Sequence, residues 1–480
     1  MQPAAADLPV GSSVTLQVQS ALGNLTVTAQ NPALLTVTIN QPAETVTLVG
    51  VAPGATALTI TDQRGVSAIV PVRVAYNAGT YAENASLQLT GDPAGPEFVK
   101  AEAAALARSL AQARPGAQIV AGAGDVSFEH ALGQDDVADV PVPVLIQGNG
   151  DFSVSGTTMV RVENVAAPRI SPDSLMISDF PEKLLHNGLL FTAKLRHEVP
   201  TRFLYYHYNP PGQPDRRIVL RVHNYSPEPA TLQFIEGRAG PYRNGLEVGH
   251  DSTKTFLVRL VHNEGRLIEI PGDGTMNLVE QLLPAGDIVN NLMQLRVLNG
   301  GTVNLTLFAQ NASGSPDESL ANIKLLNGTH RHARGIFAIP ELHYAAQWNV
   351  TDPYLELPIG QIPLPNLLKG HALAGDYGVL QSFVVNIINP MPTPQHVAIY
   401  ENPRGGTATG TFLIDGTIVQ SHQVPAFSRF KIRQYVIPAK GFVRVTIVTM
   451  PESASSYPLR LIFAPDDGSV PPGAPGSPIY

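Results

Sequence analysis

The sequence predicts a mainly β protein made of serial β-sandwich domains, with one small α+β domain among them. Three observations predict this class. Apolar and polar residues alternate with a period of two in many short segments, 42 glycines and 42 prolines mark frequent turns, and only 15% of residues are charged. With 480 residues the chain exceeds a single core, and its length predicts about three or four domains.

Charge, hydropathy and cysteine content exclude several classes of protein. The net charge is −8 and no block of like charges occurs, which argues against a nucleic-acid partner. No apolar run reaches the ~18 residues of a membrane span. The absence of cysteine excludes disulfides, thiolate metal sites and cysteine nucleophiles. The first residues, MQPAAADLPVG, lack a signal peptide pattern, as expected for a mature secreted protein or for a cytoplasmic one.

The first predicted domain, residues 8–76, contains seven or so short alternating segments separated by turn residues, which is typical of a β-sandwich. Its central run is NPALLTVTINQPAETVTLVGVAPGATALTITDQRG, residues 31–65. An Asn-Pro start and a Gly-Val-x-Pro-Gly turn fall on these residues: Asn31, Pro32, Gly50, Val51, Pro53 and Gly54. On these residues the run resembles the bacterial Ig-like group 2 domain. The resemblance implies an Ig-like module of a kind common in bacterial surface and adhesion proteins, usually acting as a spacer.

The second predicted domain, residues 77–167, is the small α+β domain. A helix is predicted to start at Pro96 and to stop before Pro115 and Gly116. The apolar positions of this helix are Phe98, Val99, Ala103, Leu106 and Leu110. Strand-like segments follow it, so we expect its alanine-rich face to pack on a sheet.

The third and fourth predicted domains, residues 168–315 and 316–466, are two copies of one β-sandwich. The run RIVLRVHNYSPEPATLQFIEGRAG from Arg217 matches SFVVNIINPMPTPQHVAIYENPRGG from Ser382. Four positions recur at one constant offset: Asn224 and Asn389, Pro227 and Pro392, Pro229 and Pro394, Glu236 and Glu401. The residues that suggest chemistry are not shared between the copies: His223, Tyr225 and Glu228. The shared residues therefore predict a turn between two strands.

Two later matches extend the duplication. LPAGDIVNNLMQLRV from Leu283 matches IPAKGFVRVTIVTM from Ile437, and VNLTLFAQ matches LRLIFAPD. This alignment gives the first copy eleven more residues between Glu236 and Pro284 than the second has between Glu401 and Pro438. The excess includes a predicted short helix, capped by Ser252, that presents Phe256, Leu257, Leu260 and Val261. The tail, residues 467–480, has no core-forming pattern and is predicted to be an extended arm.

A stripe of aromatic residues is the main candidate for a ligand or interface site. FLYYHYNPPG contains Tyr205, Tyr206, His207 and Tyr208. Strand alternation places Tyr206 and Tyr208 on one face and Tyr205 and His207 on the other. Such a stripe could stack on sugar rings, but a strand with one buried aromatic face and one face at an interface is the more common arrangement.

Two histidine-containing runs suggest a metal site or a catalytic site. His330 and His332 in THRHARG would lie on one face of an extended segment and are the metal candidates. The nearby arginines and the scarcity of nearby carboxylates favour a solvated linker instead. The run His250, Asp251, Ser252 has the members of a hydrolase triad, but neighbouring residues cannot converge on one another. Capping by Asp251 or Ser252 is the favoured interpretation.

Together these patterns predict a non-enzymatic structural or adhesion protein of bacteria, secreted or at the cell surface, with no cofactor. It is expected to self-associate into a homo-oligomer or polymer as a filament, surface-layer or stalk subunit, with open strand edges as acceptors. The alternative is a secreted carbohydrate-binding or carbohydrate-active protein that recognises a surface glycan through the tyrosines. A third possibility is a metal-dependent accessory protein using His330 and His332.

Overall fold

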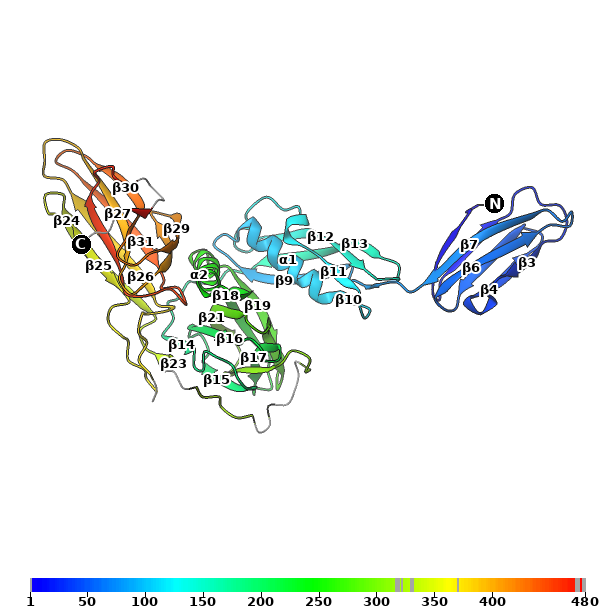
Figure 1. Cartoon of the computed structure of the whole chain (residues 1–480), viewed down its shortest axis with the longest axis horizontal. Coiled ribbons are helices and arrows are strands. Elements are labelled where there is room, and N and C mark those ends of the chain that lie inside the picture. The colour runs from blue at the N-terminus through cyan, green and yellow to red at the C-terminus, as the bar shows by residue number, and fades with distance from the viewer. Residues whose placement is uncertain are drawn as a thin grey trace. The chain divides into compact units, whose positions relative to one another are not determined.

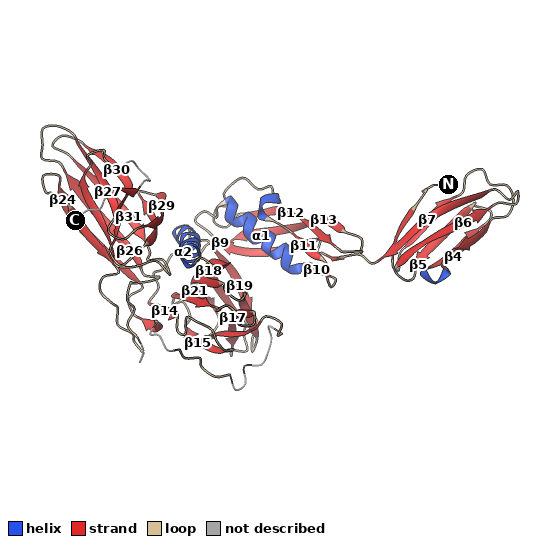
Figure 2. Ribbon diagram, in the orientation of Figure 1, coloured by secondary structure: helices blue, strands red, loops and turns tan. Residues whose placement is uncertain are grey.

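The structure is a computed structural model that describes residues 2–315, 320, 323–328, 332–368, 371–470 and 475–476. It is mainly β, with 53% strand and 8% helix (Figures 1 and 2). The predicted class, serial β-sandwich domains with one small α+β domain, is confirmed. The chain divides into two compact units, Met1–Leu87 with Gly95–Asn164, and Gln88–Ala94 with Val165–Tyr480. No helix in the described part of the chain is long and apolar enough to cross a membrane.

The N-terminal sandwich has two sheets, with strand orders β1-β7-β6-β3 and β2-β5-β4. Their inward residues, such as Leu16, Leu48 and Leu58, form one core, as the alternating sequence requires. Asn31 precedes a short 3-10 helix, η1 (Pro32–Leu34), and its side chain accepts a hydrogen bond from the backbone of Ala33. The strands are β1 (Ala6–Pro9), β2 (Ser13–Gln17), β3 (Thr26–Ala29), β4 (Leu35–Asn40), β5 (Thr45–Gly50), β6 (Gly54–Thr61) and β7 (Ser67–Ala75).

The α+β segment carries helix α1 (Pro96–Leu110) against strands β12 and β13. The helix starts at Pro96 as predicted, and its alanine-rich face is buried through Ala103, Ala104 and Ala107. Leu110, predicted to be on the buried face, is exposed at the last position of the helix. The other elements are β8 (Gly79–Thr80), β9 (Asn84–Thr90), β10 (Gln112–Ala113), β11 (Gln118–Val120), η2 (Ala123–Asp125), β12 (Val137–Gln147) and β13 (Val154–Asn164).

The first of the two C-terminal sandwiches, sandwich 1, has the sheets β15-β22-β17-β20 and β19-β18-β21-β16-β14-β23. Their facing sides enclose one core, and helix α2 packs on β18 and β21. The elements are β14 (Ser174–Ser178), β15 (Gly188–Leu195), β16 (Thr201–Tyr208), β17 (Arg216–Asn224), β18 (Ala230–Tyr242), α2 (Gly245–Val261), β19 (Gly265–Ile270), β20 (Thr275–Leu283), β21 (Ile288–Asn299), β22 (Val303–Asn311) and β23 (Arg334–Phe337).

The second, sandwich 2, has the sheets β24-β26-β31-β28-β29 and β25-β32-β27-β30-β33. Its core contains the single tryptophan, Trp348, with Phe383, Phe412 and Phe463. The strands are β24 (Glu341–Asn349), β25 (Leu355–Ile359), β26 (Leu380–Ile388), β27 (Gln395–Pro403), β28 (Ala408–Ile414), β29 (Thr417–Val424), β30 (Arg429–Ile437), β31 (Phe442–Thr449), β32 (Leu459–Pro465) and β33 (Pro475–Gly476).

The duplicated turn has the same construction in both sandwiches. It joins β17 to β18 in sandwich 1 and β26 to β27 in sandwich 2. Nδ2 of Asn224 donates a hydrogen bond to the carbonyl oxygen of Glu228 at 2.8 Å, and Nδ2 of Asn389 donates to that of Thr393 at 2.9 Å. Both asparagines are fully buried. The residues shared by the two sequence runs are therefore those that close the turn.

The same asparagines identify a different match further along the chain. Nδ2 of Asn224 also donates to the carbonyl oxygen of Pro271, and Nδ2 of Asn389 donates to that of Pro438. Pro438 therefore corresponds to Pro271, whereas the sequence comparison had matched it to Pro284. The match of VNLTLFAQ to LRLIFAPD is also wrong. The run LRLIFAPD forms β32, which lies between β25 and β27. Its equivalent in sandwich 1 is β21, the strand between β16 and β18, whereas VNLTLFAQ forms β22.

With the corrected match, sandwich 1 no longer has the predicted eleven-residue excess. The two sandwiches instead differ in the secondary structure of one connection. In sandwich 1 the chain between β18 and β19 forms helix α2. In sandwich 2 the equivalent chain between β27 and β30 forms the hairpin of β28 and β29. β28 joins the sheet of β31, whereas α2 packs on the outside of its own sheet. The two copies thus differ by a remodelled connection of similar length.

Helix α2 starts eight residues before the predicted cap at Ser252. Its N-cap is Asn244, whose side chain accepts a hydrogen bond from the backbone N–H of Leu246 at 3.1 Å. Ser252 lies inside the helix, is fully buried and donates to the carbonyl oxygen of Gly237 on β18. The capping role predicted for Ser252 is therefore wrong, and its hydroxyl instead fastens the helix to the sheet below it.

The start of the C-terminal segment contributes to packing. Val470 is 1% exposed and packs with Ala398, Tyr400 and Ile462 on the outer side of the β27 sheet. The backbone at Pro475–Gly476 pairs with β30. The prediction that residues 467–480 have no core-forming side chain is therefore wrong at Val470. Residues 471–474 and 477–480 of the predicted arm lie outside the described residues.

Candidate functional site

The tyrosine strand is β16, and its residues divide between two faces as the alternation predicts. β16 lies inside a sheet, between β14 and β21. Tyr205 belongs to the core of sandwich 1, while Tyr206 belongs to a second apolar cluster on the opposite face of the sheet. Tyr208 is half-buried at the end of the strand. The stripe is therefore not an exposed platform for sugar rings.

Tyr205 and His207 are closed off from ligands. The hydroxyl of Tyr205 donates a hydrogen bond to Oε1 of Gln281 at 2.6 Å. Nδ1 of His207 donates to the carbonyl oxygen of Pro181 at 3.0 Å, and its ring stacks on that of Tyr205. Burial lowers the pKa of His207 to about 4, so its ring is neutral at physiological pH. Both side chains act in packing.

Tyr206 reaches the wall of a cavity of about 480 Å³, the candidate functional site. The cavity lies within the second compact unit and draws residues from both sandwiches and from the chain between them. Its polar lining consists of Asp179, Glu182, Tyr206, His332, Tyr377 and Ser453. The apolar lining consists of Ile177, Leu204, Ala333, Ala372, Leu373, Ala374 and Ala454. A mixed lining of this kind is typical of small-molecule sites.

His332 links the two carboxylates of the cavity. Its Nδ1 lies 3.3 Å from Oδ2 of Asp179, and its Nε2 lies 2.8 Å from Oε2 of Glu182. The hydrogen bond with Asp179, with the negative charges nearby, raises the pKa of His332. Burial raises the pKa of Asp179 to about 7, although the hydrogen bond from His332 opposes this shift. The His332 ring therefore lies between two carboxyl groups at the wall of the cavity.

Two tyrosines complete the polar lining. Burial raises the pKa of Tyr377 to about 12, and its hydroxyl donates to the carbonyl oxygen of Ser455 at 2.9 Å. Burial also raises the pKa of Tyr206, with Glu182 and Asp179 adding to the shift. Both phenols remain neutral at physiological pH. The cavity therefore combines aromatic surface with two carboxyl groups and one imidazole.

Of the two metal candidates, the structure describes only His332. His330 lies outside the described residues. Both ring nitrogens of His332 are in contact with carboxyl groups, Asp179 at 3.3 Å and Glu182 at 2.8 Å. Within the described part of the chain, no group of three or more His, Asp or Glu side chains is arranged to hold a metal ion.

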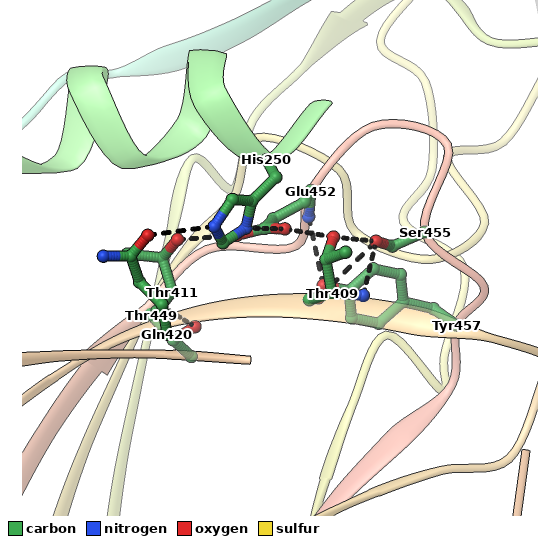
Figure 3. Close-up of polar contacts among 8 residues, drawn as sticks. All are labelled: His250, Thr409, Thr411, Gln420, Thr449, Glu452, Ser455 and Tyr457. Carbon is green, nitrogen blue, oxygen red and sulfur yellow. Dashed lines mark hydrogen bonds and ion pairs between the residues drawn. The ribbon is translucent and has the colours of Figure 1, made fainter. Parts of the chain in front are cut away.

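His250 lies at a second polar cluster, where the two sandwiches meet (Figure 3). Nδ1 of this histidine lies 3.0 Å from Oε2 of Glu452, and its Nε2 lies 3.1 Å from Oε1 of Gln420. Burial disfavours the charged ring, but the hydrogen bonds with Glu452 and Gln420 outweigh it and raise the pKa of His250. With acceptors at both nitrogens, the ring is an imidazolium paired with a buried carboxylate.

Glu452 is the centre of this second polar cluster, which we call the junction cluster. Its Oε1 accepts a hydrogen bond from the hydroxyl of Thr411 at 2.7 Å, and its Oε2 accepts one from Thr409. Its backbone N–H donates to the hydroxyl of Tyr457 at 3.0 Å. The carboxylate is fully buried, and its charge is balanced by His250. These contacts fasten α2 of sandwich 1 to β28 and the chain after β31 in sandwich 2.

The members of the predicted triad do not converge. His250 faces Glu452, the hydroxyl of Ser252 bonds to the sheet below, and Asp251 is exposed. Sequence reasoning missed Asp179, Glu182 and Tyr377 in the cavity, because they come from separate parts of the chain. It also missed Glu452, which lies 202 residues from its partner His250. No local spacing in the sequence indicates either group.

No model of a known protein family matches the chain, and no curated protein matches it. Among solved structures, the chain is similar to the insect immune protein hemolin at 12% identity, over 41% of this chain and 57% of hemolin, with a TM-score of 0.19. It is similar to Bacteroides ovatus SGBP-B in complex with a mixed-linkage heptasaccharide at 10% identity, over 63% and 71% of the two chains, with a TM-score of 0.15. It is also similar to mouse clustered PcdhgC3 EC1-3 at 10% identity, over 34% of this chain and 66% of that chain, with a TM-score of 0.13.

These neighbours include adhesion and carbohydrate-binding proteins, all at low identity. The chain spans little more than half of hemolin. TM-scores this low do not indicate a shared overall fold, so the fold class is based on the sheet topology of the chain itself.

Proposed function

We propose that the chain is a non-enzymatic structural or adhesion protein of bacteria, secreted or held at the cell envelope. It works through self-assembly or surface presentation, as a subunit of a filament, a surface layer or a stalk. Its N-terminal sandwich is an Ig-like group 2 module that acts as a spacer.

The observation that carries this proposal is the polar junction of the two C-terminal sandwiches. The contacts of His250 with Glu452, its buried ion-pair partner, and with Gln420 link the two sandwiches within one compact unit, and the hydroxyl of Thr411 holds the glutamate in place. Removing one member of such a pair is costly, because it leaves the other charge buried without a partner. A linkage of this kind suits a protein that transmits load or holds a binding surface at a fixed distance.

The test is the state of assembly of the purified chain. We expect the mass measured by light scattering to rise with protein concentration, and electron microscopy to reveal filaments or a lattice. A chain that stays monomeric up to high concentration, with no ordered particles, would contradict self-assembly. Removing the first seven residues, and separately residues 471–480, tests whether either end takes part.

The cavity at Tyr206 supports one alternative, the binding of a glycan. Its aromatic surface and carboxylate acceptors suit a polyhydroxylated ligand, and its volume of about 480 Å³ admits a small sugar. A glycan array on the purified chain tests this alternative. Selective binding that is weakened in Tyr206→Phe and Asp179→Asn, but kept in Tyr225→Ala on an exposed turn, would support it.

A further inference from the structure

Strand β24 is an open edge of sandwich 2 (Figure 1). It runs parallel to β26 over nine residues, from Glu341 to Asn349. Its other side has no strand partner among the described residues. Edge strands of this length present a row of unpaired N–H and C=O groups, which other strands can join.

Several other edges in the same unit are covered or interrupted, whereas β20 and β29, like β24, have no outer strand partner among the described residues. The backbone of Leu367 donates to the carbonyl oxygen of Ile336 on β23, and Leu326 donates to that of Leu189 on β15. Pro475–Gly476 pairs with part of β30, and the five-residue strand β25 contains Pro358.

β24 lacks these protections. It contains no proline, lysine or arginine, and the side chains of His343, Tyr344, Ala345 and Gln347 are exposed. Natural proteins usually block a long open edge with a charge, a proline or a bulge. An edge left open over nine residues is therefore a candidate for pairing.

We infer that β24 pairs with β24 of a second copy of this chain, antiparallel about a two-fold axis at Ala345. The inference rests on the proposed self-assembly and names one surface that takes part in it, the contact that forms a dimer. Pairing of this kind joins two five-stranded sheets into one continuous sheet. A two-fold axis also makes the contact closed, with the same strand in the same role on both sides.

The sequence of β24 fits this register on both faces. On the outer face, Glu341 is opposite Asn349 and His343 is opposite Gln347, so carboxylate and imidazole groups meet amides and no like charges meet. Ala345 is opposite itself, where a small side chain lets two strands approach. On the core face, Leu342 is opposite Trp348 and Tyr344 is opposite Ala346, which continues the apolar packing.

A single introduced cysteine tests the register, because the chain has no other cysteine. Residues directly opposite in antiparallel strands have Cα atoms about 4.5 or 5.5 Å apart, within the range that a disulfide spans. With oxidised glutathione, the full-length Ala345→Cys chain should form a covalent dimer. The control is Thr417→Cys, an equally exposed position on β29 at the opposite edge of the same sheet.

Charge substitutions give a second, independent measurement. Ala345→Lys and Ala345→Glu each place like charges opposite one another, so each alone should lower the mass measured by light scattering. Mixing the two variants should restore the mass, because Lys then faces Glu across the axis. Thr417→Lys should leave the mass unchanged. The emission of Trp348, which belongs to β24, checks that the strand stays folded in each variant.

The outcomes separate the inference from the proposed function. If the unmodified chain assembles but Ala345→Cys links no better than Thr417→Cys, and mixing the charge variants restores nothing, then pairing through β24 is wrong and self-assembly stands. If Thr417→Lys rather than Ala345→Lys breaks the assembly, β29 is the edge in use and the inference is overturned. If the unmodified chain is monomeric at every concentration, both the inference and the proposed self-assembly fail.

Discussion

The two C-terminal sandwiches keep the same turn and differ in the segment that follows it. Asn224 and Asn389 close their turns with equivalent hydrogen bonds, and both are fully buried. Between the next two strands, however, sandwich 1 forms helix α2 and sandwich 2 forms the hairpin β28–β29. These two segments contact each other at the junction, where His250 on α2 meets Gln420 on β29. The two sandwiches therefore contact each other through the segments in which they differ, and not through the turn that they share.

The largest expected effect is at the junction. Glu452→Ala leaves the His250 imidazolium buried without its partner, and losing one member of a buried ion pair costs about 3–5 kcal/mol. Urea unfolding measured by circular dichroism should have a lower midpoint, with sandwich 2 separating as a transition of its own. Glu163→Ala, at an exposed residue of the other unit, is the control. A loss of stability no larger than that of the control would mean that the junction does not couple the sandwiches.

The stability of sandwich 2 should depend on pH through Glu401, the residue that matches Glu236 of sandwich 1. Burial raises the pKa of Glu401 to about 8 from a usual value near 4.5. The unfolded chain releases this proton at lower pH than the folded chain, so the free energy of unfolding should fall as pH rises from about 4.5 to about 8. The expected contribution is on the order of a few kcal/mol, because each pKa unit corresponds to about 1.4 kcal/mol.

Glu401→Gln should remove this part of the pH dependence and stabilise the protein at pH 8. Glu236→Gln is the matched change in sandwich 1, where Glu236 accepts a hydrogen bond from Asn291 at 2.7 Å and lies 3.5 Å from Arg266. If both variants keep the slope of stability against pH between 5 and 8, Glu401 does not carry it. Thermal unfolding at a series of pH values makes the measurement.

The shared turns should contribute equally to stability. Asn224→Ala and Asn389→Ala each leave buried carbonyl oxygens without a donor, at an expected cost of about 1–3 kcal/mol. Asn299→Ala, at an exposed position, should cost much less. Chemical unfolding of the three variants gives the comparison. If only one of the buried asparagines matters, the two turns are not equivalent and the duplication has diverged further than the hydrogen bonds indicate.

The smallest expected effect concerns the start of α2, which sandwich 2 lacks. Asn244→Ala removes the N-cap and should cost about 1 kcal/mol. Asn40→Ala, at an exposed residue of the N-terminal sandwich, is a control far along the chain from the helix. Urea midpoints decide the outcome. An Asn244→Ala chain as stable as its control would mean that contacts with β18 and sandwich 2 alone set where the helix begins.

The sequence reveals the repeated elements but not all of their equivalences. The turn at Asn224 and Asn389 is found because four residues recur at one offset. The later match failed because Pro271 and Pro284 each begin a turn that contains glycine, and only the hydrogen bonds of the asparagines distinguish them. Local composition predicts where turns occur, but it does not show which turn of sandwich 1 is equivalent to which turn of sandwich 2.

The first half of α2 was missed for a related reason. It contains Gly245 and Gly249, and glycine weakens a helix. A Cβ atom at Gly249 would lie 1.8 Å from the carbonyl oxygen of Ser453, so only glycine permits this approach between the sandwiches. The cavity could not be predicted either, because Asp179, His332 and Tyr377 meet only through tertiary packing. Strand alternation predicts that Tyr206 and Tyr208 lie on the face opposite Tyr205, but it does not predict which residues surround Tyr206.

The burial of Glu452 has a consequence for how this protein can be divided. The two sandwiches share a turn, yet sandwich 2 does not itself contain the histidine that pairs with its buried carboxylate. That group, His250, belongs to the other copy. The repeating unit and the unit of autonomous folding are therefore different. Expressing sandwich 2 alone would leave the Glu452 carboxylate without its ion-pair partner, whereas the intact fragment from Val165 onward retains both partners.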